Sequence, residues 1–203
     1  VRPSEGLLAV GAAVGVVALG PLLGIVVAVA LALADLVRRT RRPYDAVLGR
    51  IDGRKGYHDT GRHTDAREVP GLVLFRFDAP LFFGNADHFR RRVLEVLDDH
   101  PGARWFALAA EPITDVDTTG AEMLESLLDE LAARHGGGVR LVLAELKGPA
   151  KDRLADYGLL DHIGPENLFS TLGRTVDAYL AATDTSWVDW TDRPDPAVGG
   201  FRP

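Results

Sequence analysis

The distribution of apolar and polar residues divides the chain into a long apolar N-terminal part and a mixed remainder. Residues 6–34 contain no charged side chain, and Asp35 is the first charged residue after them. A helix needs ~20 consecutive apolar residues to cross a bilayer, because lipid cannot hydrogen-bond exposed backbone groups. The pattern therefore predicts one or more transmembrane segments within residues 1–38.

Gly20-Pro21 interrupts this apolar run and leaves two arrangements open. The run can form one long tilted helix with a kink. Alternatively, residues 7–19 form a first apolar segment and residues 22–37 form a second, which together make a helical hairpin. Both arrangements place the N-terminal part of the chain in a lipid bilayer.

A cleaved signal peptide would have an apolar core of about 7–15 residues preceded by positive charge. In this chain the basic cluster comes after the apolar run and consists of Arg38, Arg39, Arg41 and Arg42. The first residue is Val1 rather than Met, so we expect the C-terminal end of a longer membrane protein. Lys and Arg favour the cytoplasmic side of a membrane segment, and the remainder is therefore expected in the cytoplasm.

Residues 39–70 are rich in Gly, Arg, His and Asp and show no sustained apolar period. Such a segment has little apolar surface to bury. We therefore expect residues 39–70 to form an irregular juxtamembrane linker.

From residue 71 onwards the pattern predicts alternating strands and helices. Strands are expected over residues 72–77, 81–83, 105–109 and 139–143. Helices are expected over residues 86–100, 118–135, 150–157 and 168–182. Residues 105–109 are apolar on both faces, as in a strand covered by helices. This order predicts one α/β domain over residues 71–182, with a mostly parallel sheet flanked by helices.

The last segment, residues 183–203, contains three prolines and two tryptophans, Trp187 and Trp190, without periodicity. We expect a flexible tail that is either disordered or loosely docked on the domain.

Charge is unevenly distributed and limits the partners of the domain. Residues 1–55 hold eight Lys and Arg against four Asp and Glu, so the chain total of −6 leaves −10 for residues 56–203. Affinity for nucleic acid comes mainly from neutralised phosphates, and such an acidic module is not expected to bind it. The absence of cysteine agrees with a reducing compartment.

The sequence offers no pattern typical of a metal site, a cofactor site or an enzyme. His58 and His63 lie near Asp59 and Asp65 in the predicted linker, but a metal site needs three or four ligands on a rigid scaffold. The run of glycines at residues 136–138 ends a predicted helix rather than beginning one, and no Gly-Lys-Ser/Thr comes after it.

The stretch Asp115-Val116-Asp117-Thr118-Thr119-Gly120 leads directly into a predicted helix. Asp117 is a good N-cap residue, because its carboxylate can accept from backbone N–H groups of the first turn. Thr118 and Thr119 then lie at the positive end of the helix dipole, where a phosphate is favoured. Two interpretations stay open: the three residues only cap the helix, or a threonine hydroxyl is phosphorylated or faces a phosphate.

Several pieces of the sequence, in this order, resemble the C-terminal end of a SulP-family (sulfate permease) anion transporter, with its last membrane segments and a cytoplasmic STAS domain. The pieces are Pro21-Leu22-Leu23-Gly24-Ile25, Arg42-Pro43, Leu48-Gly49-Arg50, Gly56-Tyr57-His58-Asp59, residues 75–86 and Asp117-Thr118-Thr119-Gly120.

This resemblance implies a homodimeric carrier of sulfate or a related inorganic or small organic anion, whose STAS domain serves assembly and regulation. It places the anion site in helices upstream of this chain. In related bacterial anti-sigma-factor antagonists, a Ser matching Thr118 is phosphorylated by a partner kinase. The alternative function is therefore a membrane-tethered STAS module that switches a regulatory protein partner through phosphorylation of Thr118.

Overall fold

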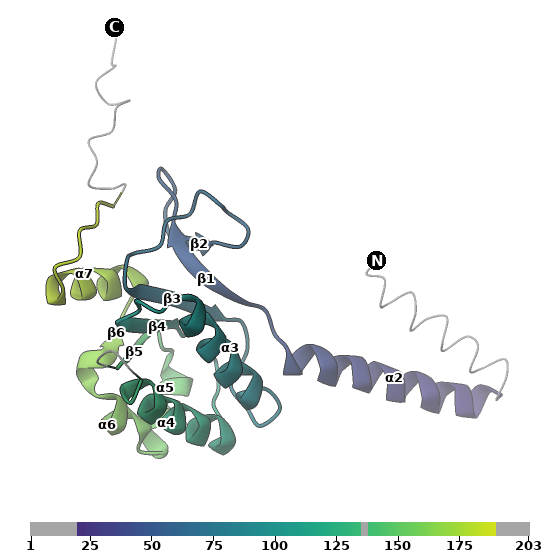
Figure 1. The fold of residues 1–203 in the computed structure, drawn as a ribbon. Coiled ribbons are helices and arrows are strands. Elements are labelled where there is room, and N and C mark those ends of the chain that lie inside the picture. The colour runs from purple at the N-terminus through teal and green to yellow at the C-terminus, as the bar shows by residue number, and fades with distance from the viewer. Residues whose placement is uncertain (1–19, 135–137, 190–203) are drawn as a thin grey trace, which may run out of the picture. The chain divides into compact units, whose positions relative to one another are not determined.

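The computed structural model describes residues 20–134 and 138–189 (Figure 1). The chain divides at Pro43 into two compact units, Val1–Pro43 and Tyr44–Pro203. The predicted apolar segment over residues 7–19, the glycines at positions 136 and 137, and Trp190 lie outside the described residues.

The described part of the first unit is helix α2 (Pro21–Arg41). Pro21 occupies the first helical position, where its missing N–H is not needed, and Gly20 before it has φ +83°. Gly20-Pro21 therefore marks a helix start. The apolar side chains of Leu22, Ile25 and Val29 are exposed. Among the residues that the structure describes, no helix combines the length and the apolarity needed to cross a membrane.

The second unit is built around one six-stranded sheet with the order β2-β1-β3-β4-β5-β6. Its strands are β1 (Asp45–Arg50), β2 (Tyr57–Asp59), β3 (Leu72–Phe77), β4 (Trp105–Ala109), β5 (Arg140–Ala144) and β6 (Leu168–Phe169). Strands β3, β4 and β5 pair in parallel, as predicted, and β6, which was not predicted, pairs in parallel with β5. β1 pairs antiparallel with both β2 and β3, which makes the sheet mixed.

Helices cover both faces of this sheet (Figure 1). They are α3 (Ala86–Asp99), α4 (Thr118–Ala132), α5 (Gly148–Asp156), α6 (Leu159–Ile163) and α7 (Leu172–Ala182), with a short 3-10 helix η1 (Pro165–Asn167). Successive residues of a strand point to opposite faces, so the largely apolar strands β3, β4 and β5 supply side chains to two separate core layers.

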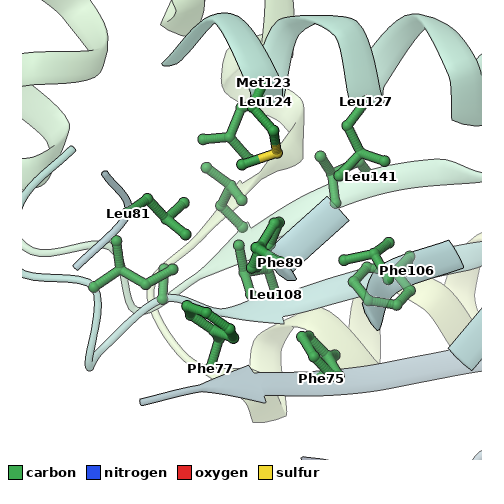
Figure 2. Packing of buried hydrophobic residues seen from close by; sticks show 14 of the residues in the cluster. Phe75, Phe77, Leu81, Phe89, Phe106, Leu108, Met123, Leu124, Leu127 and Leu141 are labelled. Carbon is green, nitrogen blue, oxygen red and sulfur yellow. The ribbon is translucent and has the colours of Figure 1, made fainter. Parts of the chain in front are cut away.

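The larger core layer lies between the sheet and helices α3 and α4 (Figure 2). Phe75 and Phe77 of β3 meet Phe89 of α3 in edge-on contacts, with ring centroids 6.2 and 5.0 Å apart. Phe106 of β4 and Leu127 of α4 are also buried in this layer. On the other face, Leu74 and Trp105 pack with Tyr179 of α7.

The prediction of an irregular linker over residues 39–70 is wrong for residues 45–50 and 57–59, which form β1 and β2. β1 lies inside the sheet between β2 and β3, and Ala46 and Leu48 are buried in the second core layer. The six residues of β1 have charged residues, Asp45 and Arg50, at their ends and include Gly49. This composition is not typical of a strand, so the strand was not recognised in the sequence. Their place is fixed by backbone pairing to β3, and backbone pairing leaves no hydrophobic period in the sequence.

Three further predictions are corrected. Residues 81–83 form no strand, because only Leu81 makes an isolated bridge, to Val116. The predicted helix over 168–182 begins at Leu172, and residues 168–169 are the edge strand β6. The tail is docked rather than flexible as far as Asp189: Trp187 packs against the second core layer.

Candidate functional site

The loop that begins α4 is built around the carboxylate of Asp117. One carboxylate oxygen accepts from the backbone N–H of Gly120 at 2.8 Å, so Asp117 is the N-cap of α4. The other oxygen accepts from the backbone N–H of Phe83 at 2.9 Å. A single side chain thus satisfies a free donor of the helix and holds a loop from a distant part of the sequence.

Backbone contacts join the same two loops. Leu81 N–H donates to the carbonyl of Asp115 at 3.0 Å, and Asp117 N–H donates to the carbonyl of Leu81 at 3.0 Å. Gly120 lies against this junction, because a Cβ at that position would be 2.8 Å from the Leu81 carbonyl oxygen. The loop after β3 and the first turn of α4 therefore form one rigid element.

Thr118 and Thr119 are the first two residues of α4, and both are exposed. Phe83, whose N–H is held by Asp117, is 77% exposed. We call Phe83, Thr118 and Thr119 the α4-start surface. It combines hydroxyl groups at the positive end of a helix with an unburied aromatic ring.

We predict that Asp117→Ala lowers the free energy of unfolding by about 1–2 kcal/mol, because an N-cap and a hydrogen bond to a neighbouring loop are both lost. Asp117→Asn is the matched control, because asparagine caps helices as well as aspartate does, while its amide NH2 cannot accept from the N–H of Phe83, so this variant loses only the contact with the loop. Chemical unfolding of both variants measures the effect. Equal losses for the two variants would contradict the cap as its cause.

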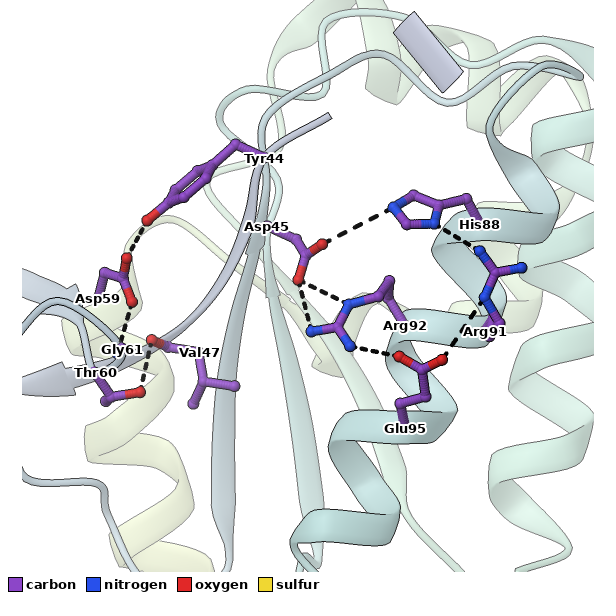
Figure 3. Close-up of polar contacts among 10 residues, drawn as sticks. All are labelled: Tyr44, Asp45, Val47, Asp59, Thr60, Gly61, His88, Arg91, Arg92 and Glu95. Atoms are coloured by element: carbon purple, nitrogen blue, oxygen red, sulfur yellow. Dashed lines mark hydrogen bonds and ion pairs between the residues drawn. The ribbon is translucent and has the colours of Figure 1, made fainter. Parts of the chain in front are cut away.

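The start of β1 is fixed to the rest of the domain by two polar clusters (Figure 3). The hydroxyl of Tyr44 donates to the carboxylate of Asp59. The next residue, Asp45, accepts from Arg92 of α3 at 3.0 and 2.9 Å. The hydrogen bond to Asp45 raises the pKa of Arg92 above its ordinary value. The chain is thus anchored to α3 directly after the unit boundary at Pro43.

A cavity of about 410 Å³ lies at the carboxyl ends of β4 and β5, beside the start of α7. Carboxyl ends of parallel strands are a common place for ligands in α/β proteins. Arg50, Tyr57, Arg76 and Glu145 contribute polar groups to its wall. Glu145 has φ +63°, and its carboxylate accepts from the N–H of Leu172 at 3.3 Å.

Burial raises the pKa of Tyr57 to about 12, from an ordinary value of 10.0. The folded state therefore favours the neutral phenol, and this contribution to stability is complete below pH 10 and is lost as the pH rises through 12. We predict that Tyr57→Phe flattens the fall in unfolding free energy over this range. Unfolding measurements at several pH values test it, and an unchanged slope would contradict it.

His58 and His63 lie close together, with ring centroids 5.7 Å apart. Among the described residues, no group of three or more His, Cys, Asp or Glu side chains is arranged to hold a metal ion.

Comparison with known proteins identifies the domain. Residues 63–175 match the STAS domain family. The chain belongs to the STAS-domain family. Its α/β fold, with a mixed sheet flanked by helices, is the fold of that family.

Sulfate transporters are relatives of this STAS chain, which confirms the resemblance to the SulP family. A probable sulfate transporter of Mycobacterium tuberculosis is 42% identical over 179 residues, which cover 88% of this chain and 31% of the relative. Sulfate transporter 1.3 of Arabidopsis thaliana is 29% identical over 177 residues, which cover 83% of this chain and 26% of the relative. The chain spans less than a third of either relative.

A solved structure shows the same fold. The murine anion transporter Slc26a9, in its inward-facing state, superposes with a TM-score of 0.75 at 18% identity, and the match covers 89% of this chain and 29% of that chain.

Sequence reasoning found the α4 start of this STAS domain but missed its neighbours. The structure brings Asp117, Thr118 and Thr119 together with Phe83, which lies 34 residues before Asp117. The cavity beside α7 was missed as well. The sequence feature that could have indicated this cavity is the presence of polar residues, including Glu111 and Glu145, shortly after strands β4 and β5.

Proposed function

We propose that this chain is the C-terminal part of a membrane anion transporter that carries sulfate or a related inorganic or small organic anion. The observation that carries the proposal is the 42% identity to a probable sulfate transporter over 179 residues. The STAS match ends at residue 175, and only 28 residues come after it. The aligned residues therefore include part of the chain before the STAS domain, where the apolar run lies.

In this proposal residues 1–38 belong to the membrane part, and the STAS domain lies in the cytoplasm. The uncharged stretch over residues 6–34 and the exposed apolar side chains of α2 support contact with lipid. The four arginines between Arg38 and Arg42 support a cytoplasmic location for the domain after them. The anion binds to upstream helices. The protein functions as a homodimer, in which the STAS domain serves assembly and regulation.

Anion uptake by liposomes that contain the full-length protein tests this function. We expect uptake of labelled sulfate, and competition by bicarbonate and dicarboxylates ranks the substrates. Protein-free liposomes are the control. Uptake at the level of that control for every anion would contradict the proposal.

A second candidate function is a membrane-tethered module that switches a protein partner by phosphorylation of Thr118. The exposed position of Thr118 at the start of α4, beside the exposed Phe83, favours it. A phosphate on this hydroxyl would lie at the positive end of the helix.

Labelled ATP and a cell extract that contains the partner kinase test this second function. We expect Thr118→Ala to abolish labelling and partner exchange without changing anion flux, whereas the matched variant Thr119→Ala keeps both. Labelling that survives Thr118→Ala would exclude the switch at this residue.

A further inference from the structure

The cavity beside the start of α7 has an apolar floor. Leu48 of β1, Ala109 of β4 and Leu172 of α7 line it, and all three belong to the second core layer. Its volume of about 410 Å³ falls within the usual range of small-molecule sites. The cavity can therefore receive the apolar body of a small molecule, and the charges in its wall decide which one.

Two arginines in the wall of this cavity have carboxylate partners of their own. Nε of Arg50 lies 3.0 Å from the carboxylate of Asp189. Nε of Arg76 lies 2.9 Å from the carboxylate of Asp78. A cation whose charge is already compensated by a nearby anion attracts a second anion only weakly. The basic residues therefore give the cavity little affinity for an anionic ligand.

The two glutamates in the wall are less well compensated. Glu111 has Lys147 as a cationic neighbour at 3.5 Å, but both side chains are at least half exposed, so this attraction is weak. Within the part of the chain that the structure describes, Glu145 forms no ion pair, and its carboxylate accepts from the backbone N–H of Leu172 at 3.3 Å. A second cavity, of about 480 Å³, has the same two glutamates in its wall. Two cavities thus share a pair of carboxylates with little free positive charge beside them.

Glu145 is held in an unusual backbone conformation. Its φ is +63°, and it is the one residue other than glycine with a positive φ in the described part of the chain. Its N–H donates to the carbonyl of Phe169 at 2.9 Å, directly after β5, so the edge of the sheet maintains this conformation. Strained backbone of this kind clusters at binding sites. The carboxylate is therefore presented from a fixed position in the wall.

We propose that this cavity binds a small organic amine in its ammonium form. The ammonium group donates to the carboxylate of Glu145 in a charge-assisted hydrogen bond, and Glu111 adds negative charge nearby. The alkyl part of the ligand packs on the apolar floor. The net charge of −10 over residues 56–203 adds a long-range attraction for cations. This ligand is opposite in charge to the anions that the transporter proposed above would carry.

Amide NMR of the full chain in an uncharged detergent, with butylamine as the probe, tests the site. At neutral pH the amine is protonated, as a lysine side chain is. We expect saturable shifts of the Leu172 and Gly173 amide signals, which report on the cavity wall, with a Kd in the millimolar range for so small a probe. Butyrate has the same number of carbon atoms and the opposite charge, and we expect no saturable shift with it. Saturable binding of butyrate, or none of butylamine, would overturn the proposal.

Glu145→Gln separates the charge of the carboxylate from the shape of the cavity. Glutamine is nearly the same size and its side-chain oxygen still accepts from the N–H of Leu172. We expect the Kd for butylamine to rise about tenfold, because a charge-assisted hydrogen bond becomes a neutral one. An unchanged Kd would overturn the assignment of Glu145.

The matched control is Glu122→Gln, which removes the same charge from an exposed position of α4 outside the cavity wall. We expect its Kd for butylamine to equal that of the unaltered chain. Equal weakening in both variants would also overturn the proposal, since it would show attraction to the overall charge of the domain instead of to a site.

Discussion

Phe89→Ala is expected to lower the free energy of unfolding by about 3–5 kcal/mol, the usual cost of removing a fully buried aromatic side chain. Phe89 is 0% exposed and contacts the rings of Phe75 and Phe77 between α3 and the sheet. Truncation leaves a cavity among rigid aromatic rings, which cannot close around it. Denaturant unfolding monitored by tryptophan fluorescence measures the loss.

Phe83→Ala provides the matched control, because it removes the same atoms from a side chain that is 77% exposed. Its expected cost is within about 0.5 kcal/mol, as for most surface substitutions. If the two variants lost similar stability, the burial of Phe89 could not be the cause. Phe83→Ala also tests the α4-start surface, since a partner that contacts this ring would bind the stable variant more weakly.

Gly120→Ala is expected to cost about 1–3 kcal/mol through overpacking. Alanine is the better helix former, so propensity alone would predict the opposite sign. The added Cβ would lie 2.8 Å from the carbonyl oxygen and 3.1 Å from the carbonyl carbon of Leu81. These are backbone atoms, held by hydrogen bonds to Asp115 and Asp117, and they cannot move without disturbing the α4 start.

Gly148→Ala is the corresponding control at the first residue of α5, where a Cβ meets no atom within 4 Å. We expect a change within about 1 kcal/mol, with stabilisation favoured by helix propensity. Thermal or denaturant unfolding of both variants compares them directly. A Gly120→Ala variant as stable as Gly148→Ala would show that the loop after β3 is free to move.

The parts of the fold that can be predicted from the sequence are those with a strong apolar period. Strands β3, β4 and β5 and helices α3 and α4 lie within a few residues of their predicted positions. Each of them buries a continuous face, and the apolar residues of that face recur at a regular spacing in the sequence. Strand β4 is covered by helices on both faces, as its unbroken apolar run predicts.

The elements that were missed are short or polar and depend on their neighbours. β2 consists of Tyr57, His58 and Asp59 and exists because its backbone pairs with β1. β6 has two residues and completes the edge beside β5. Backbone hydrogen bonds between strands carry little sequence information, so these elements could not be located without the rest of the sheet.

At the candidate site, too, local features can be predicted from the sequence and contacts between distant segments cannot. The residues 117–120 predict a capped helix start, because capping is a local interaction between a side chain and the next turn. Three other features depend on contacts between segments that are far apart in the chain. They are the hydrogen bond of Phe83 to the α4 start, the cavity between β5 and α7, and the docking of Trp187 on Arg67.

The apolar N-terminal run, the order of the main strands and helices of the STAS domain, and the cap at Asp117 are all visible in the amino-acid sequence. The completion of the sheet by residues 45–59 and the contacts of residues 183–189 with three arginines emerge only in the folded chain. Local hydrophobic spacing and capping act over a few residues and can be read along the chain. Pairing of polar edge strands and ion pairs such as Arg50–Asp189 depends on which distant segments meet.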